Sequence, residues 1–278
     1  MNFRAIAAMA AFILAGAFSL PANAVSAGVQ PGVHANAALA SAIRSPLRSP
    51  QFVARDRFRH PAEVLSFVGL RPGMTVLEIW PSGGYWTEIL APYASATGGH
   101  YIAAVPSGKH GLPAKFADKS AYGDITPAVF NGKSGPLAPP GSVDLVLTFR
   151  NVHNWIGQTG MPEKAMADFY AALKPGGVLG LEEHRADPRP MVKDATDGYV
   201  STAYVIGLAE KAGFKLEAQS EIGANPKDTK DYPFGVWTLP PTRLSAPEGQ
   251  PQNSAFDHSK YDAIGESDRM TLRFRKPQ

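Results

Sequence analysis

Apolar positions along the chain alternate between two periods, and the alternation predicts an α/β fold. Short apolar runs bounded by glycine, proline or polar residues are typical of buried strands, whereas apolar residues three and four apart indicate helices. The runs predict strands at residues 74–80, 100–105, 121–125, 143–149, 178–183 and 214–220. The helical spacing predicts helices at residues 61–68, 85–93, 113–119, 162–173 and 197–213. Strands and helices that alternate in this way form a mostly parallel sheet with helices on both faces.

The C-terminal pattern adds a strand after a long break in this alternation. Met270, Leu272 and Phe274 alternate with polar side chains, as in a half-buried strand. Residues 222–267 are rich in Pro, Asn, Asp and Gly, and we interpret them as a long insertion in which only residues 234–239 suggest a short strand. A loop of this length inside a domain is usually functional or disordered.

The first 24 residues have the pattern of a cleavable signal peptide. Arg4 precedes an apolar stretch from Ala5 to Leu20, and residues 21–24 place small side chains where a signal peptidase cleaves. The stretch is shorter than the roughly 20 residues that cross a bilayer, which disfavours the alternative of a membrane anchor. The chain has no cysteine, so a lipid anchor at the cleavage site and disulfides are excluded. We expect a periplasmic or secreted protein, cleaved near Ala24, without stable membrane insertion.

Residues 25–59 are expected to form an N-terminal arm ahead of the domain at residues 60–278. The arm is rich in Ala, Ser, Pro and Arg, and such sequences bury little apolar surface, so its first half is predicted to be mobile. Residues 49–57 carry enough apolar and charged side chains to lie against the domain as a lid. Arg44 and Arg48 are interpreted as part of a solvated basic arm.

The charge balance narrows the class of ligand. Lys and Arg number 27 and Asp and Glu number 24, for a net charge of +3. This balance argues against a nucleic-acid-binding protein, which needs a basic surface. The length and the apolar fraction of 44% suit one domain with a core of its own. No nucleic acid is therefore expected as a partner.

Four short motifs occur in an order that characterises one known family. They are Val76-Leu77-Glu78 before a glycine turn, Asp144-Leu145-Val146, the run LKPGG at residues 173–177, and Ala212-Gly213-Phe214. In this order the chain resembles the class I S-adenosylmethionine (SAM)-dependent methyltransferases. Through residues 55–61, 150–155 and 268–277 it more closely resembles a group of exported bacterial predicted methyltransferases. The resemblance implies a Rossmann-like class I methyltransferase fold, with a seven-stranded sheet whose last strand is antiparallel.

The resemblance also implies where SAM would bind. In the family, the turn after the first strand approaches the methionine end of SAM. An acidic residue after the second strand binds the ribose, and a polar residue near the third strand contacts adenine. The positions of this sequence that we assign to cofactor binding are Glu78, Pro81, Ser82, Gly83, Gly84, Asp124 and Asn151.

The sequence departs from the family pattern at two places in this site. Trp80 and Ser82 replace the first two glycines of the turn, and the second strand ends at Val105 without a carboxylate after it. Glycine is used where backbone must pass close to a ligand or adopt a positive φ. Trp80 therefore either fills space that SAM would need, or points into the core while residues 81–84 form the bend.

A second group of polar residues follows two strands that are neighbours in this fold. His153 comes after the fourth strand, and Glu183 and His184 end the fifth. The carboxyl ends of parallel strands meet where ligands bind. We interpret His153 and His184 as catalytic base or acid, Glu183 as a residue that orients a histidine or holds a substrate amine, and Arg185 as able to bind an anionic group. A hydrogen-bonded loop histidine is the alternative for His153.

Two other kinds of site fit the sequence less well. The two histidines and Glu183 lack the close spacing of metal sites, so no metal is predicted. No Gly-x-Ser-x-Gly elbow follows a strand, which argues against a serine hydrolase.

Two functions of different classes therefore remain. The first is a SAM-dependent methyltransferase acting on a small or lipid-like acceptor in the periplasm. The second is a non-catalytic protein that has the methyltransferase fold and binds a different small ligand. The lost glycines and the missing ribose carboxylate favour the second function. So does the expected compartment, because SAM is made in the cytoplasm.

Overall fold

The computed structural model describes residues 37–107, 111–188 and 190–278 of the 278-residue chain. The expected signal peptide at residues 1–24 lies outside the described residues. In the described ranges, no helix is long and apolar enough to cross a membrane.

Seven strands form one sheet in the order β3-β2-β1-β4-β5-β7-β6. The strands are β1 (Thr75–Ile79), β2 (His100–Val105), β3 (Ile125–Val129), β4 (Val143–Phe149), β5 (Leu173–His184), β6 (Lys215–Ser220) and β7 (Arg269–Arg275). Strand β7 pairs antiparallel with both β5 and β6, and the other neighbours pair in parallel. This topology confirms the seven-stranded class I methyltransferase fold predicted from the sequence.

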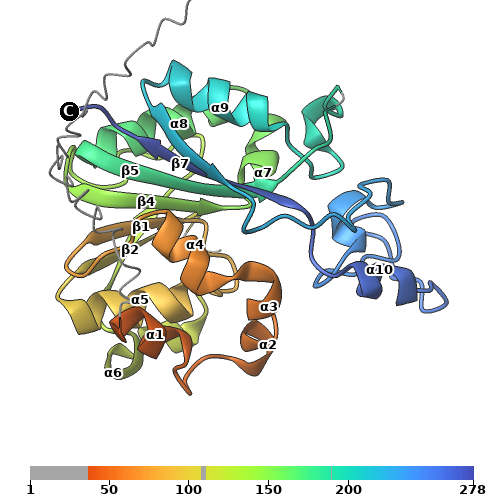
Figure 1. Cartoon of the computed structure of the whole chain (residues 1–278), viewed down its shortest axis with the longest axis horizontal. Helices are drawn as coiled ribbons and strands as arrows, with labels where there is room; N and C mark the ends of the chain where they lie inside the picture. The colour runs from red at the N-terminus through yellow and green to blue at the C-terminus, as the bar shows by residue number, and fades with distance from the viewer. Residues whose placement is uncertain (1–36, 108–110, 189) are drawn as a thin grey trace, which may run out of the picture. The chain divides into compact units, whose positions relative to one another are not determined.

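Helices cover both faces of the sheet, which explains why its central strands are apolar on both sides (Figure 1). On the face of α8 and α9, Val146 of β4 packs in a core with Trp155. On the face of α1, α4 and α5, Leu145 of β4 packs in a second core with Ile89. The helices are α1 (Ala37–Ile43), α2 (Pro50–Val53), α3 (Asp56–Arg59), α4 (Pro61–Phe67), α5 (Thr87–Thr97), α6 (Lys119–Tyr122), α7 (Val152–Ile156), α8 (Met161–Ala172), α9 (Thr202–Lys211) and α10 (Ser259–Ile264). The 3-10 turns are η2 (Ala114–Ala117), η3 (Lys193–Ala195) and η4 (Gly235–Thr238).

The N-terminal segment is more ordered than its composition predicts. Residues 37–43, expected to be part of a mobile arm, form α1, in which Leu39 and Ala42 are buried. Arg48, expected in solvent, is buried and donates hydrogen bonds of 2.6 and 2.8 Å to Asp56. Both predictions were wrong because a few apolar positions and one charge pair order this segment, and composition alone does not reveal their partners.

Other differences concern short elements. Strand β3 begins at Ile125, where the predicted strand ended, and α6 occupies the residues before it. Residues 234–239 were expected to form a strand, but η4 lies there, and α7 and α10 occupy segments expected to be loops. Helix α9 begins at Thr202 rather than residue 197, because the Ser201 side chain caps it.

Glu266, at the end of the insertion, ties the N-terminal segment to β7. Its carboxylate accepts hydrogen bonds from Arg55 Nε at 2.5 Å, Arg59 Nε at 3.1 Å and Arg269 Nη2. Arg59, Glu266 and Arg269 are all buried. Burial opposes ionisation of Glu266, yet the Arg269 and Arg59 guanidinium groups hold the pKa of its carboxyl well below the usual range. We call Glu266 with its three arginines the Glu266 clamp.

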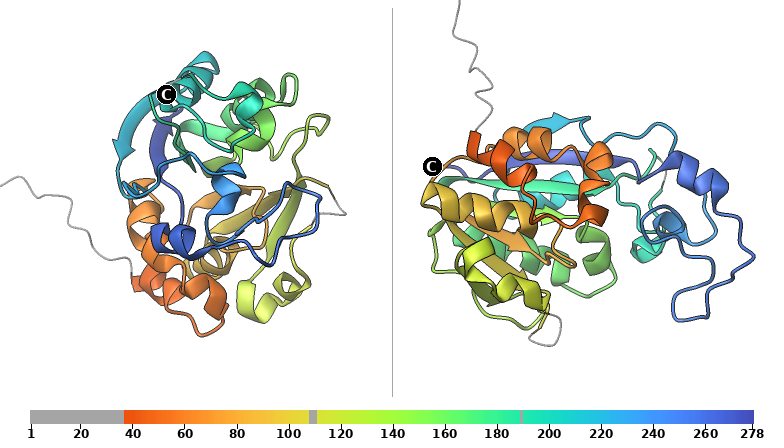
Figure 2. Two further views of the ribbon diagram at one scale, coloured as in Figure 1. Left: turned by 90° about the vertical axis from the view of Figure 1, so that its right-hand side faces the viewer. Right: turned by 90° about the horizontal axis from the view of Figure 1, so that it is seen from below.

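The insertion is closed at its base by Asn225. The side-chain amide of Asn225 donates to the carbonyls of Ile264 (3.0 Å) and Glu266 (2.7 Å), and its backbone N–H donates to Asp268 (2.9 Å). The insertion therefore returns to the sheet beside the point where it leaves β6. The left view of Figure 2 looks onto the carboxyl ends of the parallel strands, with the blue insertion in front of them and the orange N-terminal helices at the lower left.

Removing the charge of Glu266 tests the clamp. We expect the variant E266Q to lose about 3–5 kcal/mol of unfolding free energy, because it leaves buried guanidinium groups without their counter-charge. The control is E221Q, since the Glu221 side chain is 72% exposed where it pairs with Arg185, and exposed pairs contribute at most about 1 kcal/mol. Urea unfolding of both variants measures the difference, and equal losses would contradict the role of the clamp.

Candidate functional site

A cavity of about 300 Å³ opens at the carboxyl ends of β1, β4 and β5. Its lining includes Ser82 and Asn151, predicted to bind cofactor, and His153 and His184, predicted to be catalytic. The two groups of predicted residues therefore meet in one place.

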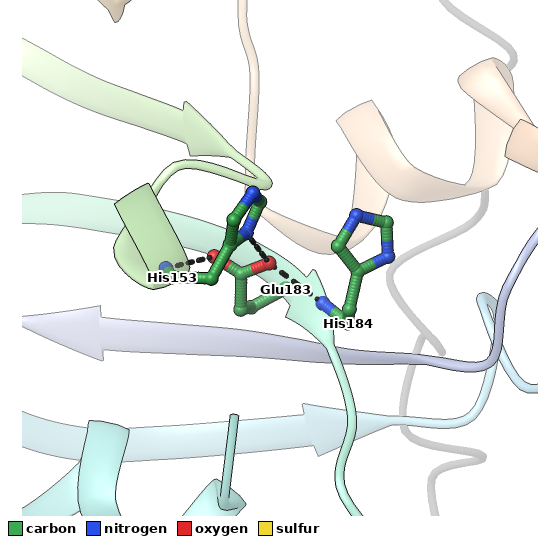
Figure 3. A group of neighbouring side chains, drawn as sticks. All are labelled: His153, Glu183 and His184. Carbon is green, nitrogen blue, oxygen red and sulfur yellow. Dashed lines mark hydrogen bonds and ion pairs between the residues drawn. The ribbon is translucent and has the colours of Figure 1, made fainter. Parts of the chain in front are cut away.

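Glu183 orients His153 at this edge of the sheet (Figure 3). Glu183 is fully buried at the end of β5, and its Oε1 lies 2.9 Å from His153 Nδ1. The carboxylate also accepts the backbone N–H groups of His153 (3.2 Å) and His184 (2.8 Å). An ionised carboxylate only accepts hydrogen bonds, and beside one the Nδ1 of His153 is the donor and Nε2 is left as an acceptor. In this arrangement Nε2 is the ring nitrogen of His153 that can accept a proton from a ligand.

His184 is held differently, beside His153. Its Nδ1 lies 2.5 Å from Ser267 Oγ, and the two imidazole rings are 5.2 Å apart. Burial lowers the pKa of His184 well below its ordinary value, and His153 and Arg150 lower it further. His184 is therefore neutral, and it serves as a hydrogen-bonding wall of the cavity rather than as a second charged group.

The same three residues have the chemistry of metal ligands. His153, Glu183 and His184 can each place a ligand atom within 4.8 Å of the others. However, the carboxylate of Glu183 already accepts three hydrogen bonds, and Arg150 and Arg269 act on His184 with positive charge. These surroundings disfavour a divalent cation and favour proton transfer.

Trp80 lies across the end of β2. Its indole donates a hydrogen bond of 2.8 Å to the carbonyl of Phe130, just beyond β3, and β2 separates β1 from β3 in the sheet. The ring packs against Phe130 and Trp155 at the border of the core. Trp80 thus points toward the core, but it also covers the strand end where the resemblance places the ribose.

The turn after β1 is bent by residues with positive φ. Trp80 has φ of 46°, Ser82 of 52° and Gly84 of 91°. A Cβ atom on Gly84 would lie 2.4 Å from the ring of Phe116, so packing in this protein already requires glycine there. Ser82 and Gly83 are the exposed residues of this turn, and both line a cavity.

The other residues assigned to cofactor binding differ in their surroundings. The Asn151 side chain donates to the carbonyl of Ile79 (2.8 Å) and to Thr148 Oγ1 (3.2 Å), so it joins the ends of β1 and β4. Glu78 is buried and accepts hydrogen bonds from Tyr101 and, at 3.3 Å, from Thr87. Burial raises the pKa of Glu78 to about 7. Glu78, Pro81, Ser82 and Gly83 all line a neighbouring cavity of about 110 Å³.

Asp124 was assigned wrongly. It precedes β3 and therefore lies at the amino end of that strand, opposite the cavities. Its side chain is 82% exposed and pairs with Lys119. The predicted strand at 121–125 placed Asp124 near the carboxyl end of a strand. The strand in the structure begins only at Ile125, so Asp124 comes before it.

Four arginines at the same edge were not predicted as site residues. We call Arg55, Arg59, Arg150 and Arg269 the arginine cluster. Arg55 and Arg150 line both the 300 Å³ and the 110 Å³ cavity, Arg59 lines only the smaller and Arg269 only the larger. Arg55, Arg150 and Arg269 lie in the three segments that carried the closer family resemblance, but nothing in the pattern showed that they would meet.

Two further cavities adjoin this centre. One of about 380 Å³ lies at the end of β2, lined by Trp80, Ser82, Val105, Pro106 and Gly111. The other, of about 850 Å³, is bounded largely by the insertion and shares His153 and Trp237 with the central cavity. Ser82 and Trp80 thus lie where three cavities meet, and His153 lies between two.

Comparison with known proteins supports the fold. No protein-family model and no curated protein matches the sequence. Among solved structures, the chain is similar to a SAM-dependent methyltransferase of Aquifex aeolicus, at 17% identity and a TM-score of 0.51 over 80% of this chain and 93% of that one. It is also similar to the cyclase SpnF, at 13% identity and a TM-score of 0.55 over 79% and 81%.

A third similar structure is phosphoethanolamine N-methyltransferase 2 of Haemonchus contortus, at 16% identity and a TM-score of 0.51. That match covers 87% of this chain and 60% of the other. At these identities the similarity shows the class I methyltransferase fold and leaves the reaction to be argued from the site.

The site fits the polar end of SAM. Arg55 Nη2 and Arg59 Nη2 are buried N–H groups without a hydrogen-bond partner in the described part of the chain, and both arginines line the 110 Å³ cavity beside Ser82. Unpaired guanidinium donors next to this turn suit a carboxylate such as that of methionine. At the end of β2 the described residues Pro106 and Ser107 supply no carboxylate for a ribose.

The raised pKa of Glu78 predicts a pH-dependent stability. Since its folded-state pKa is about 7 and its ordinary value 4.5, the stability that neutral Glu78 contributes is complete below pH 4.5 and is lost as pH rises through 7. The variant E78Q should therefore gain up to about 3 kcal/mol relative to the wild type between pH 5 and pH 8. Urea unfolding at both pH values measures this gain.

The control for E78Q is E63Q, because Glu63 lies exposed on α4. We expect E63Q to follow the wild type at both pH values. Parallel pH profiles for E78Q and the wild type would show that Glu78 is ionised in the folded protein throughout this range.

Proposed function

We propose that the protein is a SAM-dependent methyltransferase that acts on a small-molecule acceptor. The observation that carries the proposal is the meeting, in one cavity of a class I methyltransferase sheet, of the Ser82 turn with the His153–Glu183 pair. Ligands bind at the carboxyl ends of the strands in open α/β sheets, and a positioned base at that edge suits group transfer.

Residues on both sides of Ser82 would hold the cofactor. Arg55 and Arg59 would take its methionine carboxylate in the 110 Å³ cavity. The 380 Å³ cavity at the end of β2 offers room for its nucleoside, with Trp80 as a flat apolar wall. When bound, SAM supplies an electrophilic methyl group.

The acceptor would react through an oxygen or nitrogen that loses a proton as it gains the methyl group. His153 Nε2 accepts that proton, and Glu183 stabilises the resulting imidazolium through Nδ1. The 850 Å³ cavity on the far side of His153 gives space for the rest of the acceptor. Its lining includes Tyr232, Phe234 and Trp237, so aromatic surface is available to a partly apolar molecule.

A second candidate function follows from Trp80. Because its indole crosses the end of β2 and no carboxylate follows that strand, the site also suits a protein that binds a different small ligand. The cyclase SpnF, to which the chain is similar, illustrates that one fold can serve different reactions.

The compartment is also part of the proposal. We infer that the mature protein is periplasmic or secreted, in the manner of the exported bacterial group that it resembles. The support is the arrangement of residues 1–24, with Arg4, an apolar stretch and small residues near Ala24. An exported methyltransferase would require SAM outside the cytoplasm.

Cofactor binding is tested by thermal unfolding with S-adenosylhomocysteine (SAH), the demethylated product of SAM. Saturation at 100 times Kd stabilises a protein by about 2.7 kcal/mol, which corresponds to a rise in midpoint of roughly 5–10 °C at this size. The variant S82F should lose the shift because a phenyl ring fills the junction of three cavities. The matched control S82G keeps the junction open, and glycine adopts the positive φ of this position without steric strain. S82G should therefore retain the shift.

No midpoint shift with SAH in the wild type would favour the second candidate function. A shift that S82F leaves unchanged would mean that SAH binds away from the predicted site.

The role of His153 is tested on the same protein once an acceptor turns over. We expect H153N to lower kcat by about 10²- to 10⁴-fold, the range for loss of a general base. E183Q should lower kcat less, because a neutral amide can still orient the imidazole but does not stabilise its positive charge. The control is H60N, which alters a histidine that lines none of the four cavities at this edge. An unchanged kcat in H153N would remove His153 from the reaction.

A further inference from the structure

Arg150 is a guanidinium group without a counter-ion at the centre of the site. It follows β4 with φ of 61°, and its backbone N–H donates to the carbonyl of Glu182 at 2.7 Å. Its side-chain nitrogens form no hydrogen bond or ion pair with any described residue, and its Nε is buried. Removing an unpaired charge from water is unfavourable, and strained conformations persist only where the surrounding structure imposes them. Neither feature is explained by packing.

The positive charge of the arginine cluster exceeds the negative charge of the carboxylates around it. The carboxylate of Glu266 is shared among Arg55, Arg59 and Arg269. The other nearby carboxylate, Glu182, is buried without a hydrogen bond, and its closest cation is Arg269 Nε at 3.7 Å. Glu182 and Glu266 thus face four guanidinium groups, and burial raises the pKa of the third carboxyl at this edge, Glu78, to about 7. Glu183 cannot make up the difference, because its oxygens already accept from His153 and from backbone N–H groups.

Unused hydrogen-bond donors accompany this missing charge. Arg150 Nε is buried without a hydrogen-bond partner, as are the Nη2 atoms of Arg55 and Arg59, and the only acceptor near Arg269 Nε among the described residues is Glu182 Oε1 at 3.7 Å. Buried polar groups in native proteins are nearly always hydrogen-bonded, so a group of unpaired donors of one charge points to a missing acceptor. The acceptor that guanidinium groups bind best is a carboxylate or a phosphate.

We propose that Arg150 and Arg269 bind the anionic group, a carboxylate or a phosphate, of a small molecule in the 300 Å³ cavity. Both arginines line that cavity together with His153, so one ligand reaches the anion site and the base. The binding of an anion does not depend on methyl transfer. Identification of this ligand as the methyl acceptor rests on the proposed function.

This anion site adjoins the one assigned to the cofactor. Arg55 and Arg150 line both cavities, but Arg269 lines only the 300 Å³ cavity and Arg59 only the 110 Å³ cavity. A ligand at Arg150 and Arg269 and a cofactor carboxylate at Arg55 and Arg59 can therefore be present together. Arg150 is the one arginine of the cluster that forms no hydrogen bond with Glu266, and in this proposal the ligand anion takes that place.

The experiment measures thermal unfolding of the protein with inorganic phosphate and, separately, with acetate, against sodium chloride at equal ionic strength. At saturation we expect a rise in midpoint of roughly 5–10 °C with at least one of the two anions. A shift with phosphate alone would indicate that the ligand carries a phosphate. A shift with acetate alone would indicate a carboxylate, and a shift with both anions would indicate that the site accepts either group. No shift beyond that of chloride with either anion would overturn the proposal.

Variants of Arg150 locate the site. R150Q should lose the anion shift, while its midpoint without anion should not fall, because the change removes an uncompensated charge. R150K keeps the charge without the planar fork and should retain a reduced shift. R44Q is the control, since Arg44 lies exposed at the end of α1, and it should behave as the wild type. If R150Q and R150K retain the full anion shift, the anion binds elsewhere and the proposal fails.

Adding SAH separates this inference from the proposed function. Additive shifts from SAH and the anion support two sites, whereas an anion shift that disappears with bound SAH would mean that the cofactor carboxylate uses Arg150, contrary to the proposal. An anion shift without any SAH shift would leave the anion site standing and overturn the proposed function alone.

Discussion

The structure depends on a single buried carboxylate, Glu266, that three arginines share. Arg55 and Arg59 come from the N-terminal segment and Arg269 from β7, so this contact joins parts of the chain more than 200 residues apart in sequence. Burial of these charges is tolerated because each guanidinium group finds the carboxylate and because Arg269 also donates to the carbonyl of Phe58. The contact fixes α2 and α3 beside the carboxyl ends of the strands.

The cavities follow from that constraint. With α2 and α3 on one side and the closed insertion on the other, the edge of the sheet becomes a set of connected spaces instead of an open groove. Arg150 then faces a region that already has more positive than negative charge, and its side chain makes no hydrogen bond with a described residue. The His153–Glu183 pair lies in the same region. The anion binding and the proton transfer that we propose would therefore share one local arrangement, whatever group is transferred.

Much of the fold could be predicted from the sequence, because the strands at 143–149 and 178–183 are long apolar runs that only a covered sheet accommodates. His153, Glu183 and His184 could also be placed together, since strand ends that neighbour each other meet. The arginine cluster could not, because Arg59 and Arg269 meet through tertiary contacts that no periodicity reports. Asp124 failed for a related reason: a shift of one short strand moved it from the ligand edge to the opposite end.

The most direct test of this account is a crystal structure of the protein grown with SAH and phosphate. The account predicts electron density for the methionine carboxylate of SAH against Arg55 and Arg59, and for phosphate against Arg150 in the cavity that contains His153. Density for SAH with its carboxylate on Arg150, or an arginine cluster that contacts only water in the presence of both ligands, would contradict it.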